Sequence, residues 1–246
     1  MALQEEFQSQ GNFLFKYRSF FPLLFLAVAG LVFYLESCAE NEWLYCEQYW
    51  YVSLAVGLFG LLIRVLTVGF TPKNTSGRNT AEGQVADELN ETGIYSLVRH
   101  PLYVGNFFMW LGVAMLTANL WFIVAFTLTY WVYYERIMYA EEAFLRGKFE
   151  AKYLQWAEGR PAFVPKLTGF VGPKYPFSLK KVLKKEKNGI AALFGLFWIF
   201  DLIRNYIAEG HFELKQNFWF WAFIGSVVIY ILLKVVKNAS FMQDGR

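Results

Sequence analysis

The amino-acid sequence predicts an all-α protein, a polytopic transmembrane helical bundle of about six spans. Apolar residues make up 56% of the 246 positions and aromatic residues 20%, with 26 Phe, 15 Tyr and 9 Trp. A soluble domain does not need so many large aromatic side chains. The apolar residues also form long uncharged runs separated by polar connections, which is the pattern of successive membrane helices.

The first two spans are predicted at residues 19–35 and 48–70. The first run carries no charge, and the second is interrupted only by Arg64. Both are close to the roughly 20 residues that a helix needs to cross the hydrocarbon core. The stretch 71–90 is rich in Asn, Thr, Gly and charged residues, so we expect it to lie outside the membrane.

A helical hairpin is predicted next, because residues 101–134 are uncharged over 34 positions. As one helix this run would be about 51 Å long, well beyond the roughly 30 Å hydrocarbon core. Two shorter helices that turn at residues 117–119 fit better, and they return the chain to the side where it entered. The charged segment 135–158 keeps a helical rhythm and is expected to extend the fourth helix into water.

The C-terminal part contains the last two spans, at residues 189–207 and 217–236. Residues 169–176 form a Gly/Pro linker. Residues 177–187 combine apolar positions with five lysines and are predicted to form a basic helix at the membrane interface. Within the fifth span, Asp201 and Arg204 lie three positions apart and are expected to pair with each other.

These segments divide the chain into three parts. Residues 1–98 hold two spans and a polar loop, residues 99–168 hold the hairpin and its helical extension, and residues 169–246 hold the linker, the basic helix and the last two spans. No cleavable signal peptide is expected, because residues 1–12 are polar.

The orientation is predicted from the distribution of Lys and Arg. The loop 36–47 holds four Glu and neither Lys nor Arg, whereas 136–187 is strongly basic, and Lys234, Lys237 and Arg246 follow the last apolar run. Basic loops stay on the cytoplasmic side. The sequence therefore predicts a multi-pass protein of a bacterial inner membrane or the endoplasmic reticulum, with both termini cytoplasmic.

Metal-dependent chemistry and nucleic-acid binding are not expected. The chain has only two His and two Cys, which is little material for a metal site, and its basic residues cluster beside apolar spans. Cys38 and Cys46 share the acidic loop, which the charge bias places outside the cytoplasm, where a disulfide can persist. The alternative is two free thiols.

The residues that could carry chemistry lie at the two ends of the predicted hairpin. The run Arg99-His100-Pro101-Leu102-Tyr103-Val104-Gly105 opens it, and Glu141-Glu142 follows its far end. Pro101 suits the first turn of a helix, which puts Arg99 and His100 beside free amide donors and the positive end of the helix dipole. Such a position favours a bound carboxylate or phosphate. The alternative is an interfacial anchor of Arg and Tyr.

This arrangement resembles the integral-membrane methyltransferases of the isoprenylcysteine carboxyl methyltransferase and phospholipid methyltransferase group. The resemblance covers about 30% of the chain, from Gly93 to Pro165. It includes the lead-in Gly93-Ile94-Tyr95 and a tail composed of Phe149, Tyr153, Trp156, Arg160 and Pro161.

The resemblance implies that S-adenosyl-L-methionine binds in a crevice on the cytoplasmic face. It implies that His100 and Tyr103 lie near the methionine or adenine end and that Glu141 or Glu142 contacts hydroxyls. Gly105 would let the cofactor lie close to the helix. The full set expected to bind the cofactor is Tyr95, His100, Tyr103, Gly105, Glu141 and Glu142. Helical periodicity does not decide between the two glutamates.

Three arginines are expected to serve the acceptor and the transfer. Arg160, in the basic-then-proline tail, is the candidate to hold an anionic acceptor, and Arg99 at the helix start is the second catalytic candidate. Arg64 lies about six residues inside the second span, where an unpaired charge is costly. It is expected either to contact the acceptor or the cofactor, or to extend its side chain to the interface.

The acceptor is expected to be a lipid or a lipidated molecule in the membrane. Methyl transfer from a sulfonium needs alignment more than acid–base help. A carboxylate or phosphate is already ionised, whereas a protonated amine needs a base. We therefore expect O-methylation of an isoprenylcysteine-type carboxylate or a lipid A-type phosphate, with a phospholipid amine N-methyltransferase as the alternative.

Two other readings remain open. An NADPH-dependent membrane sterol or steroid reductase also carries Arg-His-Pro-x-Tyr, but there we expect Asn between Pro and Tyr and an acid after Gly. This chain has Leu102 and Asn106 at those positions. A non-catalytic scaffold or transporter would not need the motif together with the acidic pair.

Overall fold

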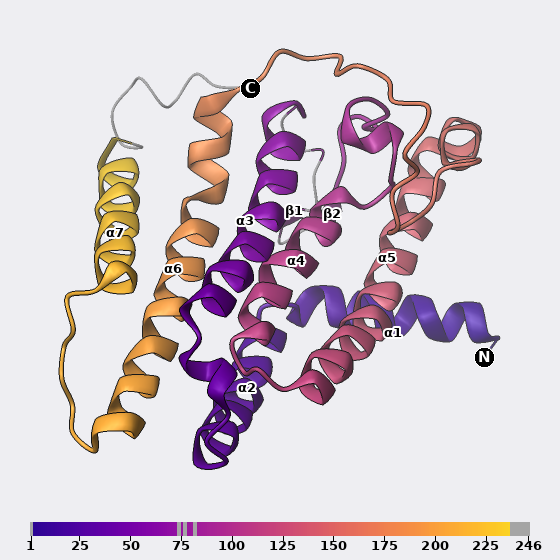
Figure 1. The fold of residues 1–246 in the computed structure, drawn as a ribbon. Coiled ribbons are helices and arrows are strands. Elements are labelled where there is room, and N and C mark those ends of the chain that lie inside the picture. The colour runs from indigo at the N-terminus through magenta and orange to yellow at the C-terminus, as the bar shows by residue number, and fades with distance from the viewer. Residues whose placement is uncertain (1, 73–74, 76–77, 81–82, 237–246) are drawn as a thin grey trace.

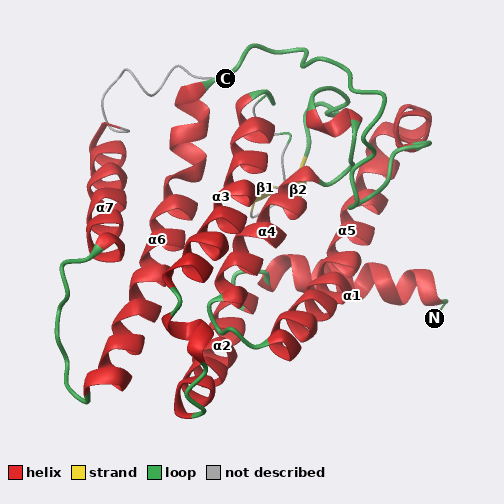
Figure 2. Ribbon diagram, in the orientation of Figure 1, coloured by secondary structure: helices red, strands yellow, loops and turns green. Residues whose placement is uncertain are grey.

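The computed structural model describes residues 2–72, 75, 78–80 and 83–236, and nearly all of its regular structure is helical (Figure 1, Figure 2). The α-helices of the described residues are α1 (Leu3–Tyr17), α2 (Phe21–Cys38), α3 (Glu47–Gly69), α4 (Pro101–Met115), α5 (Leu120–Ala157), α6 (Leu179–Glu209) and α7 (Phe218–Val236). Two short 3-10 helices, η1 (Glu42–Tyr45) and η2 (Ile94–Ser96), and one antiparallel hairpin, β1 (Arg78–Thr80) with β2 (Gly83–Val85), accompany them. The predicted helical class is confirmed.

Among the described residues, four helices are long and apolar enough to cross a membrane, namely α2, α3, α6 and α7. The apolar helix α4 has 15 residues, and α5 has 38 residues with its charged positions in the second part. A helix of the length of α4 spans about 22 Å, less than the roughly 30 Å core. Each of the six predicted spans corresponds to one of these helices. Because only four of the described helices have the length and apolarity of a membrane span, the count of six is approximate.

The predicted hairpin is formed by α4 and α5. The chain turns at Thr117, Ala118 and Asn119, and the Asn119 side chain caps α5 by accepting a hydrogen bond from the Phe122 N–H (2.7 Å). Asn at this position satisfies an amide that would otherwise lack a partner. As expected, α5 continues through the charged segment to Ala157, with one non-helical residue, Glu150.

One helix was not predicted from the sequence, and one predicted boundary is wrong. The polar N-terminal segment forms α1, which lies across α5 (Figure 1). The basic helix predicted at 177–187 and the span predicted at 189–207 are one continuous helix, α6. Gly189, the first residue of the predicted span, lies inside α6, and a helix tolerates a glycine at a cost of about 1 kcal/mol.

Helices α3 and α4 pack closely through glycines. A Cβ added at Gly60 would lie 2.4 Å from the Gly105 carbonyl oxygen, and one added at Gly112 would lie 2.6 Å from the Ser53 carbonyl oxygen. Small residues allow two helix backbones in a membrane to approach each other. Helix α6 packs on α3, and α7 packs on α6, so these helices lie side by side in Figure 1.

The acidic loop between α2 and α3 contains no disulfide. Cys38 and Cys46 are both free, and the Cys46 thiol lies 3.4 Å from Gln48 Oε1. The loop is held by hydrogen bonds of Asn41, whose side chain donates to Glu36 (2.5 Å) and accepts from the Trp43 N–H (3.1 Å). The predicted disulfide is therefore wrong for this structure.

Candidate functional site

The two ends of the sequence motif meet through backbone hydrogen bonds. The Arg99 N–H donates to the Pro161 carbonyl (3.0 Å) and the His100 N–H to the Ala162 carbonyl (3.1 Å). Next along these segments, the Lys166 N–H donates to the Leu97 carbonyl (3.0 Å). The segment after α5 is thereby fixed beside the start of α4.

His100 lies between the two glutamates at the far end of the hairpin. Its Nε2 is 2.8 Å from Glu142 Oε1, and its Nδ1 is 3.5 Å from Glu141 Oε2. The Tyr103 hydroxyl donates to Glu141 Oε2 (2.9 Å), and the Arg99 Nε lies 3.0 Å from Glu142 Oε1. The hairpin therefore brings both glutamates to the motif, where they share His100 and each has one further partner, Tyr103 for Glu141 and Arg99 for Glu142.

The charges of this group reinforce one another. Burial lowers the pKa of His100, but hydrogen bonds and attraction from Glu141 and Glu142 outweigh it and raise the pKa to about 9. Burial raises the pKa of both glutamates, and the hydrogen bond and charge of His100 reverse this, so that each pKa lies below its usual value. At neutral pH the site therefore holds an imidazolium between two carboxylates.

A cavity of about 330 Å³ lies beside this group. Six of the predicted site residues line it, namely Arg64, Tyr95, Arg99, His100, Tyr103 and Glu141. Burial and the nearby charge of Glu141 raise the pKa of Tyr95, so its hydroxyl stays protonated. Most of the charged side chains around the cavity come from the start of α4, the extension of α5 and the ends of α1, α3 and α6. We call this the polar cavity.

Three predicted site residues do not line the polar cavity. Gly105 faces α3, where an added Cβ would lie 2.5 Å from Arg64 Cγ, so the structure uses it for helix packing and does not place it at the polar cavity. Arg160 donates to the Trp156 carbonyl and lies over the Trp156 ring, so the structure does not bring it to the cavity as predicted. Glu142 reaches the site through His100 and Arg99.

Arg64 is held by a partner that the sequence did not reveal. Its Nε and Nη2 donate to the two oxygens of Glu186 (2.8 and 2.9 Å), and its Nη1 donates to Asn106 Oδ1 (2.5 Å). The Glu186 side chain is fully buried. Because of this ion pair, Arg64 does not extend alone to the interface. The only sequence signal for Glu186 is that it is the single acid within a run of lysines.

A second cavity, of about 190 Å³, lies between α4 and α6. Arg64 and Asn106 line this cavity as well as the polar cavity, and the rest of its wall is Met109, Trp110, Val113, Gly189, Ala192, Leu193 and Leu196. The wall is apolar apart from the two shared residues. We call it the apolar cavity, and Arg64 and Asn106 form its junction with the polar cavity.

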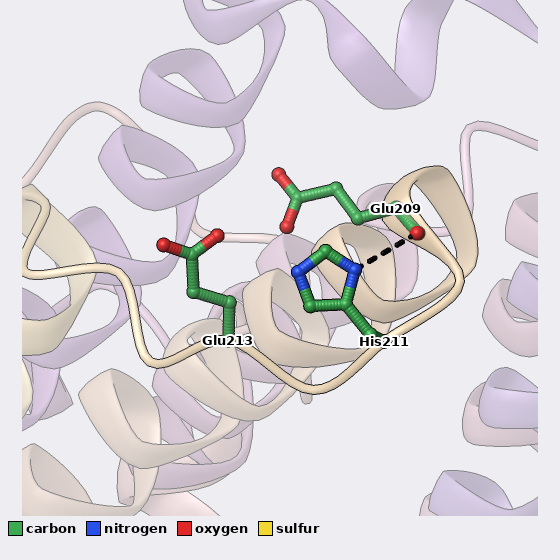
Figure 3. Close-up of side chains that lie close together, drawn as sticks. All are labelled: Glu209, His211 and Glu213. Atoms are coloured by element: carbon green, nitrogen blue, oxygen red, sulfur yellow. Dashed lines mark hydrogen bonds between the residues drawn. The ribbon is translucent and has the colours of Figure 1, made fainter.

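One group of side chains in the described residues has the spacing of metal ligands. Glu209 at the end of α6 lies close to His211 and Glu213 in the loop that follows (Figure 3). His211 and Glu213 are exposed, and Glu209 already forms an ion pair with Lys215. His211 Nδ1 lies 3.0 Å from the Glu209 carbonyl oxygen. The group lines neither of the cavities described above.

Comparison with known proteins agrees with the predicted resemblance. Residues 48–152 match the family model of phospholipid methyltransferases. A probable protein-S-isoprenylcysteine O-methyltransferase of Oryza sativa subsp. indica is 32% identical over 46% of this chain and 60% of its own length. Protein-S-isoprenylcysteine O-methyltransferase of Schizosaccharomyces pombe is 40% identical over 30% of this chain and 31% of its own.

The same region is similar to a protein with a different name. The cobalt-zinc-cadmium resistance protein CzcN of Cupriavidus metallidurans is 31% identical over 48% of this chain and 52% of its own length. The chain thus spans between about a third and 60% of the length of these relatives. No solved structure matches. The resemblance to the isoprenylcysteine and phospholipid methyltransferases is confirmed over the segment from α3 to α5.

Proposed function

From this match to the phospholipid methyltransferase family, we propose that the chain is an S-adenosyl-L-methionine-dependent methyltransferase acting on a lipid-borne acceptor. One observation carries the proposal. The matched segment folds so that His100 and Tyr103 at the start of α4 contact Glu141 and Glu142 on α5, beside the polar cavity. Sequence similarity and site geometry thereby point to the same residues.

The residues around the polar cavity fit the proposed cofactor. Bound S-adenosyl-L-methionine supplies a methyl group on a sulfonium. The carboxylate of Glu141 suits the sulfonium charge or the ribose hydroxyls, and the cations Arg99 and Arg18 suit the methionine carboxylate. The Trp156 Nε1 is buried without a hydrogen-bond partner in the described structure, and Trp156 lines the cavity. An acceptor atom of a bound ligand would satisfy this donor.

The apolar cavity supports an acceptor that carries a hydrocarbon chain. Its wall lies between two helices of the membrane part and ends at Arg64 and Asn106, where the polar cavity begins. An acceptor whose tail lies in the apolar cavity would present its head group to the polar cavity. Holding donor and acceptor in line across this junction is the main requirement of the reaction.

The positive-inside rule supports the proposed orientation, with both termini in the cytoplasm. Loop 36–47 is acidic, and the segment between α5 and α6 is basic. Lys234 lies in the last turn of α7, whereas Lys237 and Arg246 lie outside the described residues. In this orientation the polar cavity opens towards the cytoplasm, where S-adenosyl-L-methionine is available.

Binding of S-adenosyl-L-methionine to the detergent-solubilised protein tests the proposal. His100→Ala and Glu142→Gln should each weaken binding about tenfold or more, because each removes one side of a charged hydrogen bond. Isothermal titration calorimetry measures the effect. His211→Ala is the matched control, because His211 is the other histidine of the chain and is exposed in the loop after α6.

Transfer of tritium from labelled S-adenosyl-L-methionine into membrane lipid completes the test. The wild-type protein and His211→Ala should transfer label, and His100→Ala should transfer much less. If His100→Ala and Glu142→Gln bind the cofactor as the wild type does, the cofactor site lies elsewhere. If the wild-type protein neither binds the cofactor nor transfers label, the proposed activity is wrong.

A further inference from the structure

We infer that Asn106 and Glu186 orient Arg64 at the junction of the two cavities. The junction then offers hydrogen-bond donors to the head group of the acceptor, and the acceptor is therefore an oxygen acid anion on an apolar chain. This inference rests on the proposed methyltransferase function. It assigns a specificity-determining role to Asn106 and a positioning role to Glu186, which lies on α6, outside the segment that matches the family model.

The geometry of Arg64 fixes which atoms face the junction. A guanidinium has five N–H donors and no acceptor. Two of the five are bound by Glu186 and one by Asn106, so two remain on a side chain that lines both cavities. Bidentate binding by Glu186 prevents rotation of the guanidinium plane.

The contact with Arg64 also fixes the amide of Asn106. Because Arg64 can only donate, Asn106 must turn its oxygen to Arg64, and its NH2 group then points the other way. An amide NH2 has two hydrogens that it can donate. Asn106 thus adds a donor to those of Arg64.

The carboxylates near the junction are already bound. Glu186 accepts from Arg64 through both oxygens, Glu141 accepts from Tyr103 and lies against His100, and Glu142 is paired with His100 and Arg99. A protonated amine would therefore meet the cation Arg64 and find no free base to remove its proton. A carboxylate or phosphate would meet donors and needs no deprotonation. The junction favours the oxygen acid.

The bond changes are balanced without a further reactant. An oxygen of the anion attacks the methyl carbon, the new O–CH3 bond forms as the S–CH3 bond breaks, and the electron pair of that bond stays on sulfur. The sulfonium becomes a neutral thioether, and the acceptor loses one negative charge. The donors of Arg64 and Asn106 hold the anion in position for this displacement.

Replacing Asn106 tests the role of the junction without a change of shape. Asn106→Asp keeps the size of the side chain but replaces the NH2 donor by a carboxylate oxygen. We expect it to raise the KM for an anionic acceptor roughly tenfold or more, because a charged hydrogen bond is replaced by repulsion. The dissociation constant for S-adenosyl-L-methionine should stay within about twofold. Asn188→Asp is the matched control, because Asn188 is exposed on α6 and lines neither cavity.

Replacing Glu186 tests its positioning role. Glu186→Gln keeps one acceptor for Arg64 but loses the second, so Arg64 can rotate. We expect a higher KM for the anionic acceptor, a smaller change in kcat and unchanged cofactor binding. A purely structural role would lower the amount of folded protein and leave the KM of the folded fraction unchanged. Gel filtration and thermal unfolding in detergent measure the folded fraction.

The probes are an S-farnesyl-cysteine derivative with a free carboxylate, its carboxamide, a farnesyl phosphate and phosphatidylethanolamine in vesicles, each with tritiated cofactor. Label released as methanol by mild alkali identifies a carboxyl ester, and alkali-stable label on the phosphate probe identifies a phosphate ester.

Label on either oxygen acid, with a KM raised in Asn106→Asp, supports the inference. Label on phosphatidylethanolamine nitrogen, or an unchanged KM in Asn106→Asp, overturns it and leaves the methyltransferase function standing. If the wild-type protein labels no probe and no membrane lipid, the proposed function itself is wrong.

Discussion

Two buried ion pairs in this bundle have the same chemistry and different surroundings. Arg64 pairs with Glu186 across 122 positions, next to both cavities, whereas Asp201 pairs with Arg204 three positions away within α6. Asp201 also accepts from Asn205 (3.2 Å) and Asn217 (2.7 Å), and Arg204 lies over the Trp50 ring (4.4 Å). The first pair leaves donors directed at a cavity, and the second is enclosed by protein groups.

The difference indicates how the structural role of a buried ion pair can be distinguished from a role in ligand binding. A pair whose groups all have protein partners serves to join elements, here α6 to the start of α7 and to α3. A pair that leaves donors beside a cavity is available for a ligand. Burial of the charge alone does not separate the two cases, because Asp201 and Glu186 are both almost completely buried.

The largest effect is expected from Asp201→Ala. It leaves Arg204 buried without its acid and removes the acceptor of Asn205 and Asn217, and breaking such a pair costs about 3–5 kcal/mol. Thermal or denaturant unfolding in detergent measures the loss. Cofactor binding at low temperature should be unchanged, and weaker binding with unchanged stability would contradict the assignment of this cluster to structure.

A pH-dependent effect on stability should follow from the His100 group. The pKa of His100 is raised from its usual 6.5 to about 9, so its contribution to stability is complete below pH 6.5 and is lost as the pH rises through about 9. The upper limit is about 3 kcal/mol, from about 1.4 kcal/mol per pKa unit. Glu141 and Glu142 have a lowered pKa, so their contribution is lost at the acid end instead.

Melting temperatures in detergent between pH 6 and pH 10 test the predicted loss of stability as His100 is deprotonated. The wild-type protein and His211→Ala should lose stability across this range, and His100→Ala should lose much less. A slope that survives in His100→Ala would assign the titration to another group.

The smallest effect is expected from Arg160→Ala. Arg160 is tied to the Trp156 carbonyl and lines neither cavity, so its loss should cost about 1 kcal/mol of stability and leave the acceptor KM unchanged. The prediction from the sequence, in which Arg160 holds the acceptor anion, requires a lower turnover with partial rescue by Arg160→Lys. Steady-state kinetics with the same acceptor probes decides between them.

The sequence predicted the features that depend on local patterns. The hairpin followed from an uncharged run too long for one span, and the Asp201–Arg204 pair followed from helical spacing. The meeting of His100 and Tyr103 with Glu141 and Glu142 followed from the hairpin and the family resemblance together. The sequence did not decide between the two glutamates because both contact His100, one at each ring nitrogen.

The features that the sequence did not predict depend on contacts between distant segments. Glu186 lies among lysines that indicate a surface, and only the packing of α6 on α3 brings it to Arg64. The family resemblance implied that Gly105 lies close to the cofactor, and only the packing of α4 on α3 shows that this glycine faces Arg64. The polar segment that forms α1 has no long apolar run to indicate its packing on α5.

The pairing of Arg64 with Glu186 has a consequence for biosynthesis. A chain made from its N-terminus exposes α3 to the membrane well before α6 has been synthesised, so Arg64 must enter before its partner exists. The rest of α3 must compensate, and the most apolar 18-residue window of α3 has a mean hydropathy of 2.1, the highest such value among the four long apolar helices of the described residues. Until α6 inserts, the growing chain carries an unneutralised cation in the bilayer, and the arrival of Glu186 marks the point at which the junction can assemble.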